Sequence, residues 1–223
     1  MLRIRPALHV FLLALTLLPP PAFAKKTVLS KAIDLRKLEL KYSSVESFEA
    51  EFTQEVYQAT LARTKSSKGA LMLSKPKLVR WETHAPEKTV LVSNGIKVWY
   101  YTPKAGGDEK GQVVVRSAAE LASNALLGIL NGTISIDKEF TLKDTKQSEE
   151  TTGLTLVPKK KMGDIAEVVL EVDDKYLIRE VKLNHTSGNR TKITLQNIRL
   201  GAKLPTNLFK FSPPPGTNIV TGP

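Results

Sequence analysis

The stretch SKPKLVRWETHAPEKTVLVSNGIKVWYYTP, residues Ser74 to Pro103, decides how this chain folds. It contains three short apolar runs, each bounded by a proline or by Asn94-Gly95, and these residues favour tight turns. We therefore predict antiparallel strands at Leu78 to Thr83, Thr89 to Val92 and Lys97 to Thr102. Both tryptophans of the chain lie in these strands, so the sheet carries large apolar surface next to several lysines.

The two-residue alternation of apolar and polar side chains continues on both sides of this stretch. Between Phe48 and Val56, apolar residues alternate with glutamate and threonine, which is typical of a strand with one buried face. The prolines of the closing segment, Leu204 to Val220, predict irregular structure there. Further strands are predicted at Gly69 to Leu73, Gln112 to Arg116, Leu154 to Val157, Ile165 to Val172, Tyr176 to Asn184 and Arg190 to Leu200.

Two stretches have the three- and four-residue spacing of amphipathic helices. The first runs from Lys31 to about Val45, with Ser30 as its expected N-cap. The second begins at a capping box, Ser117-Ala118-Ala119-Glu120, and places leucines and an isoleucine on one face as far as Leu130. Many consecutive strands and few helices predict one domain, a strongly curved antiparallel sheet with helices over one face. Such a sheet either retains an apolar concavity or closes into an ordinary core.

The N-terminus, Met1 to Ala24, has the three parts of a secretory signal: Arg3 and Arg5, an apolar run, and a small-residue cleavage site. Removing it takes away two of the 33 basic residues and none of the 22 acidic ones, so the remaining domain, residues 25–223, keeps a net charge of +9. A basic protein favours an acidic partner, an anionic membrane surface or a nucleic acid. Export and the lack of a nucleic-acid module argue against the last.

The sequence offers little catalytic chemistry. The chain has no cysteine, and the part after the signal has only two histidines, His84 and His185, both expected in loops. The acidic pairs Glu149-Glu150 and Asp173-Asp174 lie in expected turns, where solvated side chains are common. Metal-binding, nucleotide-binding and nucleophile-elbow motifs are absent from the sequence. We therefore expect no enzyme activity, no cofactor and no metal.

Four segments together resemble one known family. They are SFEAEFTQEV (Ser47 to Val56), GALMLSKPKLVRWET (Gly69 to Thr83), LVSNGIKVWYYTP (Leu91 to Pro103) and LPTNLFKFSPPPGTNIV (Leu204 to Val220). In order and spacing they are similar to the periplasmic lipoprotein carrier family LolA, over nearly the whole chain after the signal. The resemblance implies a mainly β, α+β fold: an unclosed antiparallel β-barrel, or half-barrel, with helices forming a lid over an apolar cavity.

The resemblance also implies a function. Members of this family are soluble periplasmic carriers of Gram-negative bacteria that take acylated lipoproteins from an inner-membrane ABC transporter and pass them to an outer-membrane receptor. We expect a monomer that binds no nucleic acid. The physical need for a carrier is clear, because each methylene exposed to water costs about 0.8 kcal/mol and acyl chains therefore do not cross the periplasm unshielded.

The resemblance assigns candidate sites by position. Lys75, before Pro76, stands where relatives have an arginine that bonds to the lid, with Arg80 as a possible substitute and Val79 at the expected cavity rim. We expect the Lys75 ammonium to reach the free carbonyls at the end of the second helix, near Leu130 and Asn131. The candidate acyl-chain cavity comprises Trp81, Leu91, Trp99, Leu126, Ile129 and Leu130.

Other functions remain open at the level of sequence. The main alternative is a lipid-binding periplasmic regulator or a carrier of free lipid on the same half-barrel. An outer-membrane receptor of this fold would itself be a lipoprotein, and the missing cysteine argues against it. An esterase would have to show turnover that depends on one serine or histidine.

Overall fold

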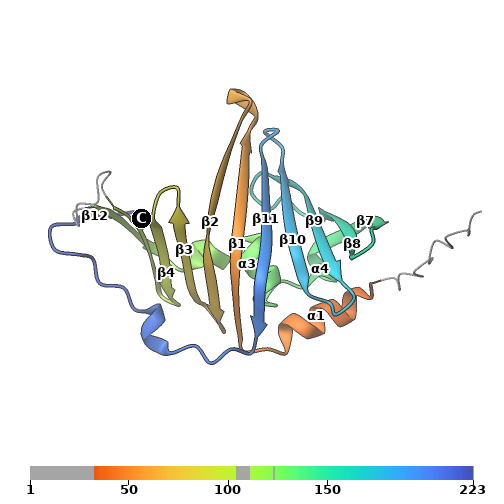
Figure 1. Cartoon of the computed structure of the whole chain (residues 1–223), viewed down its shortest axis with the longest axis horizontal. Coiled ribbons are helices and arrows are strands. Elements are labelled where there is room, and N and C mark those ends of the chain that lie inside the picture. Colours follow the sequence, from red (N-terminus) through yellow and green to blue (C-terminus); the bar gives the residue numbers. More distant parts are fainter. Residues whose placement is uncertain (1–32, 104–110, 123, 223) are drawn as a thin grey trace, which may run out of the picture.

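The computed structural model describes residues 33–103, 111–122 and 124–222. The described chain forms one 12-stranded sheet in the order β12-β6-β5-β4-β3-β2-β1-β11-β10-β9-β8-β7 (Figure 1). The expected signal peptide Met1 to Ala24, the expected cap Ser30 and the loop Lys104 to Gly107 lie outside the described residues. The strands are β1 (Ser47–Gln58), β2 (Arg63–Ser74), β3 (Leu78–Ala85), β4 (Thr89–Asn94), β5 (Lys97–Thr102), β6 (Gln112–Ser117), β7 (Phe140–Gln147), β8 (Thr151–Pro158), β9 (Ile165–Asp173), β10 (Ile178–His185), β11 (Arg190–Leu200) and β12 (Asn218–Thr221).

The sheet is an open barrel. Its two end strands, β12 and β7, do not pair with each other, and every neighbouring pair is antiparallel except β12 with β6. Helices α3 (Ala125–Leu130) and α4 (Ile136–Glu139) lie behind the sheet in the view of Figure 1, and α1 (Leu35–Ser43) lies at its lower edge. This arrangement confirms the predicted fold class, a mainly β half-barrel with helices over one face. We call the face that carries the helices the inner face.

Helix α1 (Leu35–Ser43) is shorter than predicted and has a different cap. The Asp34 side chain accepts a hydrogen bond from the Arg36 backbone N–H at 2.9 Å, so Asp34 is the N-cap. The helix buries Leu38 and Tyr42. The Tyr42 hydroxyl accepts a hydrogen bond from the Ile178 backbone N–H at 2.8 Å, which fixes α1 against β10. Burial raises the pKa of this tyrosine above its usual range.

The predicted second helix is two short helices, α2 (Ala119–Ala122) and α3 (Ala125–Leu130). The Asn124 side chain caps α3 by accepting a hydrogen bond from the Leu127 backbone N–H at 3.1 Å. Every residue of α3 is buried. The remaining helical segments among the described residues are a short helix, α4 (Ile136–Glu139), and two 3-10 turns, η1 (Ala59–Leu61) and η2 (Thr206–Phe209). In the described part of the chain, no helix is long and apolar enough to cross a membrane.

The main core lies between the inner face and the helices. It joins residues of the sheet, such as Leu71 and Leu170, to Leu38 of α1 and Leu130 of α3, each no more than 1% exposed. The outer face has its own apolar cover, because the segment after β11 returns across it. There the Phe211 ring lies 5.7 Å from Tyr101, and Phe209 is only 2% exposed.

Two strands differ from the sequence expectation. Prolines 213–215 do end regular structure, but they precede Asn218, and the four residues beyond them pair in parallel with β6 as β12. Because these four residues keep their N–H groups, the prolines do not prevent the pairing. The other strand, β7, was not predicted. It is an edge strand whose side chains are exposed after Phe140, so its sequence shows little alternation of apolar and polar residues.

Arg80 holds the C-terminal segment on the outer face. Its guanidinium donates a hydrogen bond to the Leu208 carbonyl at 2.8 Å and another to the Glu82 carboxylate at 2.6 Å. Burial raises the pKa of the Glu82 carboxyl, but hydrogen bonds from Arg80 and His84 outweigh it and lower the pKa. The carboxylate is therefore ionised near neutral pH and keeps Arg80 in place.

We predict that Arg80→Met loosens this segment. Losing a hydrogen bond from a charged donor, worth about 1.5 kcal/mol or more, should speed amide exchange at Leu208 and Lys210 roughly tenfold while β1 and β2 stay protected. Hydrogen exchange measured by mass spectrometry tests this. The control is Arg199→Met, which removes an outer-face arginine paired with Glu49 at 2.7 Å. Unchanged exchange at Leu208 in the Arg80 variant would rule out the anchor.

Candidate functional site

An apolar pocket lies on the inner face where β4, β5 and β6 meet α2. Leu91 pairs with Tyr100 across β4 and β5, and Tyr100 pairs with Val114 across β5 and β6. Residues opposite each other in neighbouring strands share a face, so these side chains point together toward the helices. The pocket has a volume of about 300 Å³ and is lined by Leu91, Val98, Tyr100, Val114, Arg116, Glu120 and Leu121.

The rim of the pocket is polar and its walls are apolar. The Arg116 guanidinium lies 3.6 Å from the Glu120 carboxylate, and both side chains are about half exposed. Tyr100 is 45% exposed, which is unusual for an aromatic residue on the inner face. Hollows on the outer face differ, because charged residues such as Lys182 and Glu171 line them. The pocket at α2 therefore has the chemistry that suits an apolar chain with a polar end.

Helix α3 fills the neighbouring part of the half-barrel. Leu126, Ile129 and Leu130 are 3%, 3% and 0% exposed and belong to the main core. These candidate cavity residues therefore occupy the concavity in this structure instead of lining an open space. At about 300 Å³, the pocket at α2 is at the lower end of the range for ligand sites. A long acyl chain would need α3 to move away from the sheet.

The two tryptophans lie on opposite faces of the sheet. Trp81 pairs with Leu91 and faces inward, with its ring 4.8 Å from Phe52. Trp99 is next to Tyr100 in β5 and faces outward, where its ring lies 6.4 Å from Phe211. Assigning Trp99 to the cavity was therefore wrong. The run VWYY is apolar on both faces, so its sequence does not show which face is inner.

Lys75 does bond to the end of a helix, but to a different one from that predicted. Its ammonium donates hydrogen bonds to the Ser43 carbonyl at 2.5 Å and the Tyr42 carbonyl at 3.1 Å, at the C-terminus of α1. These carbonyls lack partners within the helix, which is why a cation fits there. The predicted contact with the carbonyls near Leu130 and Asn131 is wrong.

Helix α3 reaches the same β2–β3 turn by another route. The Asn131 side chain donates a hydrogen bond to the Pro76 carbonyl at 3.1 Å. Gly132 follows with a φ of +63°, and a Cβ atom there would lie 2.6 Å from the Tyr42 carbonyl carbon and oxygen. Only glycine allows this close approach of α3 to α1. The β2–β3 turn thus holds both lid helices, one through Lys75 and one through Pro76.

Val79 and Arg80, the other two residues predicted to lie at the rim or to bond to the lid, are not in the expected positions. Val79 is 4% exposed and belongs to the main core, so it is not at a rim. Arg80 faces outward and bonds to Leu208, so it does not replace Lys75 at the lid. Of the seven pocket residues, only Leu91 is among the cavity residues predicted from the sequence. The prediction did not include Val98, Tyr100, Val114, Arg116, Glu120 and Leu121. The signal that could have found them is their register with Leu91, which depends on knowing the inner face.

The described residues contain no cluster of three or more histidine, aspartate or glutamate side chains placed to hold a metal ion. His84 and His185 each lie beside a carboxylate, Glu82 at 3.3 Å and Asp164 at 3.0 Å, and both contacts are on the surface. A half-barrel with a lid over an apolar pocket defines a binding protein for an apolar ligand.

Comparison with known proteins identifies the family. The family model described as outer membrane lipoprotein carrier protein LolA matches residues 43–212, and the chain belongs to this family. It is 29% identical over 204 residues to an outer-membrane lipoprotein carrier protein of Dechloromonas aromatica, covering 92% of this chain and 95% of that one. A Serratia proteamaculans protein of the same name is 28% identical over 201 residues, with 88% and 91% covered.

A solved structure supports the fold. The crystal structure of an uncharacterized conserved protein from Thermus thermophilus superposes with a TM-score of 0.53 at 14% identity, covering 84% of this chain and 97% of that one. At this identity the likeness concerns the fold alone.

We predict that Lys75→Met releases α1 from the β2–β3 turn. Two hydrogen bonds from a charged donor would be lost, so amide exchange at Tyr42 and Ser44 should accelerate at least tenfold, since one such bond is worth about 1.5 kcal/mol or more. The control is Lys77→Met, two residues away and exposed. Equal exchange in both variants would show that Lys75 does not hold the lid.

Proposed function

We propose that this chain carries acylated lipoproteins across the periplasm and shields their acyl chains under the lid. The observation that carries the proposal is the apolar pocket at α2, next to the buried helix α3 that covers the neighbouring part of the inner face. The relatives named as lipoprotein carriers cover nearly the whole chain and support it. The proposal includes cleavage of residues 1–24, leaving one carrier domain at 25–223.

Acyl chains would bind by replacing α3 on the inner face. The first part of a chain would enter the existing pocket beside Leu91, with Trp81 next to it on the same face. Further methylenes would take the place of Leu126, Ile129 and Leu130, which pack there without cargo. The exchange is close to balanced, because the hydrophobic effect is non-directional and rewards either kind of apolar cover in proportion to area.

The polar contacts at the β2–β3 turn would set the affinity for acylated cargo, because they favour the closed position of the lid helices. Lys75 and Asn131 both return the lid helices to the sheet when cargo leaves. A carrier has to release its cargo, so a latch worth a few hydrogen bonds suits it better than a rigid closure. The partners in this proposal are an inner-membrane ABC transporter that loads the carrier and an outer-membrane receptor that unloads it. The chemistry requires no cofactor and no catalysis by this chain.

We predict that Tyr100→Glu weakens binding of a diacylated peptide about tenfold or more. Bound acyl chains would strip water from the new carboxylate, and the desolvation of a charge is costly. Displacement of an apolar fluorescent probe by the peptide measures the affinity. Tyr100 is 45% exposed without cargo, so folding should be unaffected.

The matched control is Leu142→Glu, which adds the same charge at a 42% exposed position on the edge strand β7, at the other end of the sheet. It should bind the diacylated peptide like the unmodified protein. If the protein fails to bind the peptide, or if both variants bind it equally well, acyl chains do not use this pocket.

A further inference from the structure

The β1–β2 hairpin projects beyond the rest of the sheet. Strand β3 pairs with β2 only from Lys68 onward, so within the described chain Arg63 to Ser67 pair with β1 alone. Figure 1 shows the hairpin rising well above the neighbouring strand β3, with η1 at its apex. We call residues 56–68 the hairpin tip. It is far from the latch at the β2–β3 turn, which lies at the opposite end of β2.

The hairpin tip is held in a defined shape. The Asn189 side chain, from the β10–β11 turn, accepts a hydrogen bond from the Ala59 backbone N–H at 2.9 Å. Ala62 adopts a left-handed conformation, with a φ of +46°, and its N–H bonds to the Ala59 carbonyl at 3.2 Å. Arg190 lies over the Tyr57 ring at 4.5 Å. These contacts give the backbone of the hairpin tip a defined shape.

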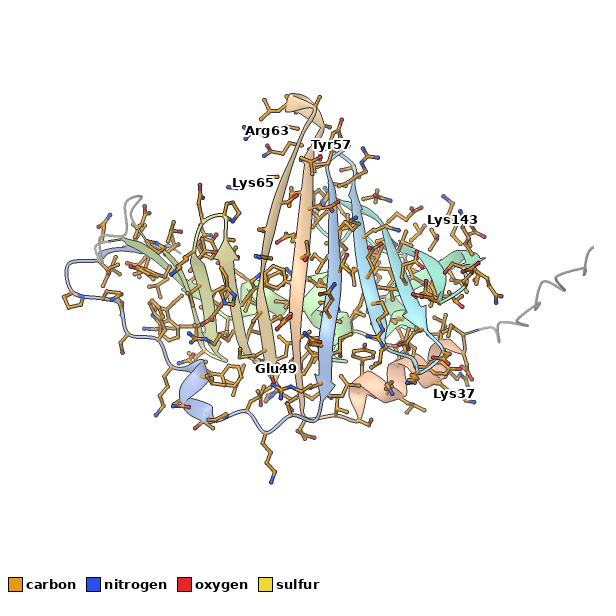
Figure 2. All side chains as sticks on the ribbon, viewed as in Figure 1. Lys37, Glu49, Tyr57, Arg63, Lys65 and Lys143 are labelled. Atoms are coloured by element: carbon orange, nitrogen blue, oxygen red, sulfur yellow. The ribbon has the colours of Figure 1, made fainter. Side chains whose placement is uncertain are left out.

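The hairpin tip has an exposed apolar residue at its apex and basic residues next to it. Leu61, at the apex, is 67% exposed. The segment from Val56 to Lys68 contains Arg63, Lys65 and Lys68 but no aspartate or glutamate. Figure 2 shows Arg63 and Lys65 just below the apex, on the side toward β3, and Tyr57 on the other side.

Nearby carboxylates compensate this charge only in part. Lys65 lies 3.5 Å from Glu87, but both side chains are largely exposed, at 60% and 75%. On the outer face, Lys192 pairs with Glu55 at 3.0 Å. Exposed pairs of this kind are weak and exchange readily for other anions. Arg63 and Arg190 add further positive charge beside these pairs. An anionic surface can therefore take the place of the glutamates as the partner of the lysines.

We propose that the hairpin tip docks this protein on an anionic phospholipid bilayer, with Leu61 entering the headgroup region and the surrounding cations contacting lipid phosphates. A bilayer receives a protruding leucine without a complementary pocket. A specific protein partner needs about 800 Å² on each side, and a single projecting apex does not offer such a surface. The net positive charge of the chain also favours binding to an anionic bilayer.

This docking goes beyond the carrier function and does not depend on it. It concerns the protein without cargo and uses no residue of the pocket or the latch. Its effect would be to keep the carrier near a membrane surface, with the anionic leaflet supplying the attraction.

The experiment measures partitioning of the protein, purified from the periplasm, onto vesicles by flotation. One set of vesicles contains phosphatidylglycerol and phosphatidylcholine, and the other contains phosphatidylcholine alone. Arg63→Gln with Lys65→Gln should lower the partition coefficient on the anionic vesicles about 25-fold, roughly fivefold for each cation. Leu61→Gln should lower it about tenfold, as expected when a leucine no longer leaves water.

Helix α1 offers a matched control for each change. Leu40 is 65% exposed, nearly the same as Leu61, so Leu40→Gln is the control for the apex. Arg36→Gln with Lys37→Gln removes the same charge from an exposed stretch that Figure 2 places at the opposite end of the molecule, where Lys37 is labelled. Both controls should partition like the unmodified protein, and all binding should fall as ionic strength rises.

Three outcomes would overturn the proposal. The first is equal partitioning on neutral and anionic vesicles. The second is a loss of binding in the α1 controls as large as in the hairpin variants. The third is binding to polyglutamate without binding to anionic vesicles, which would replace the membrane with an acidic protein partner.

Discussion

The inner face of this open sheet is apolar, and the sheet alone cannot cover it. The two end strands do not pair, so helices must supply the cover that closure would give a complete barrel. Helix α3 does so with six buried residues, while the sheet near α2 keeps a pocket of about 300 Å³. Because apolar burial depends on area and not on direction, an acyl chain can substitute for the helix. We propose that the carrier function depends on this exchange.

Polar contacts give the lid its place, and they converge on the β2–β3 turn. Lys75 bonds to the last carbonyls of α1, and Asn131 of α3's C-terminus bonds to the Pro76 carbonyl. Gly132 allows the two helices to touch backbone to backbone. The apolar contacts therefore determine how strongly the inner face is covered, while these few directional bonds determine where the helices lie on it.

The strands could be predicted from the sequence because the two-residue periodicity of a strand is a local pattern. Which face of a strand points inward depends on tertiary packing, so the faces were predicted poorly. Phe48 to Val56 alternates cleanly and formed the expected strand, whereas Trp99 lies in a run that is apolar on both faces and was assigned to the wrong one. For Lys75 the chemistry was right, an ammonium on free helix carbonyls, but the helix was α1. Which helix end comes near a turn depends on tertiary packing, which no local pattern contains.

The most direct test of the central claim places a photoreactive phenylalanine analogue at Tyr100, inside the pocket, and irradiates the living cells that make the protein. We predict that mass spectrometry will find adducts with acylated lipoproteins there, and none when the analogue replaces Leu142 on the far edge strand. Adducts with free phospholipid alone would contradict lipoprotein carriage and favour a lipid carrier or sensor. Equal adducts at both positions would contradict the pocket itself.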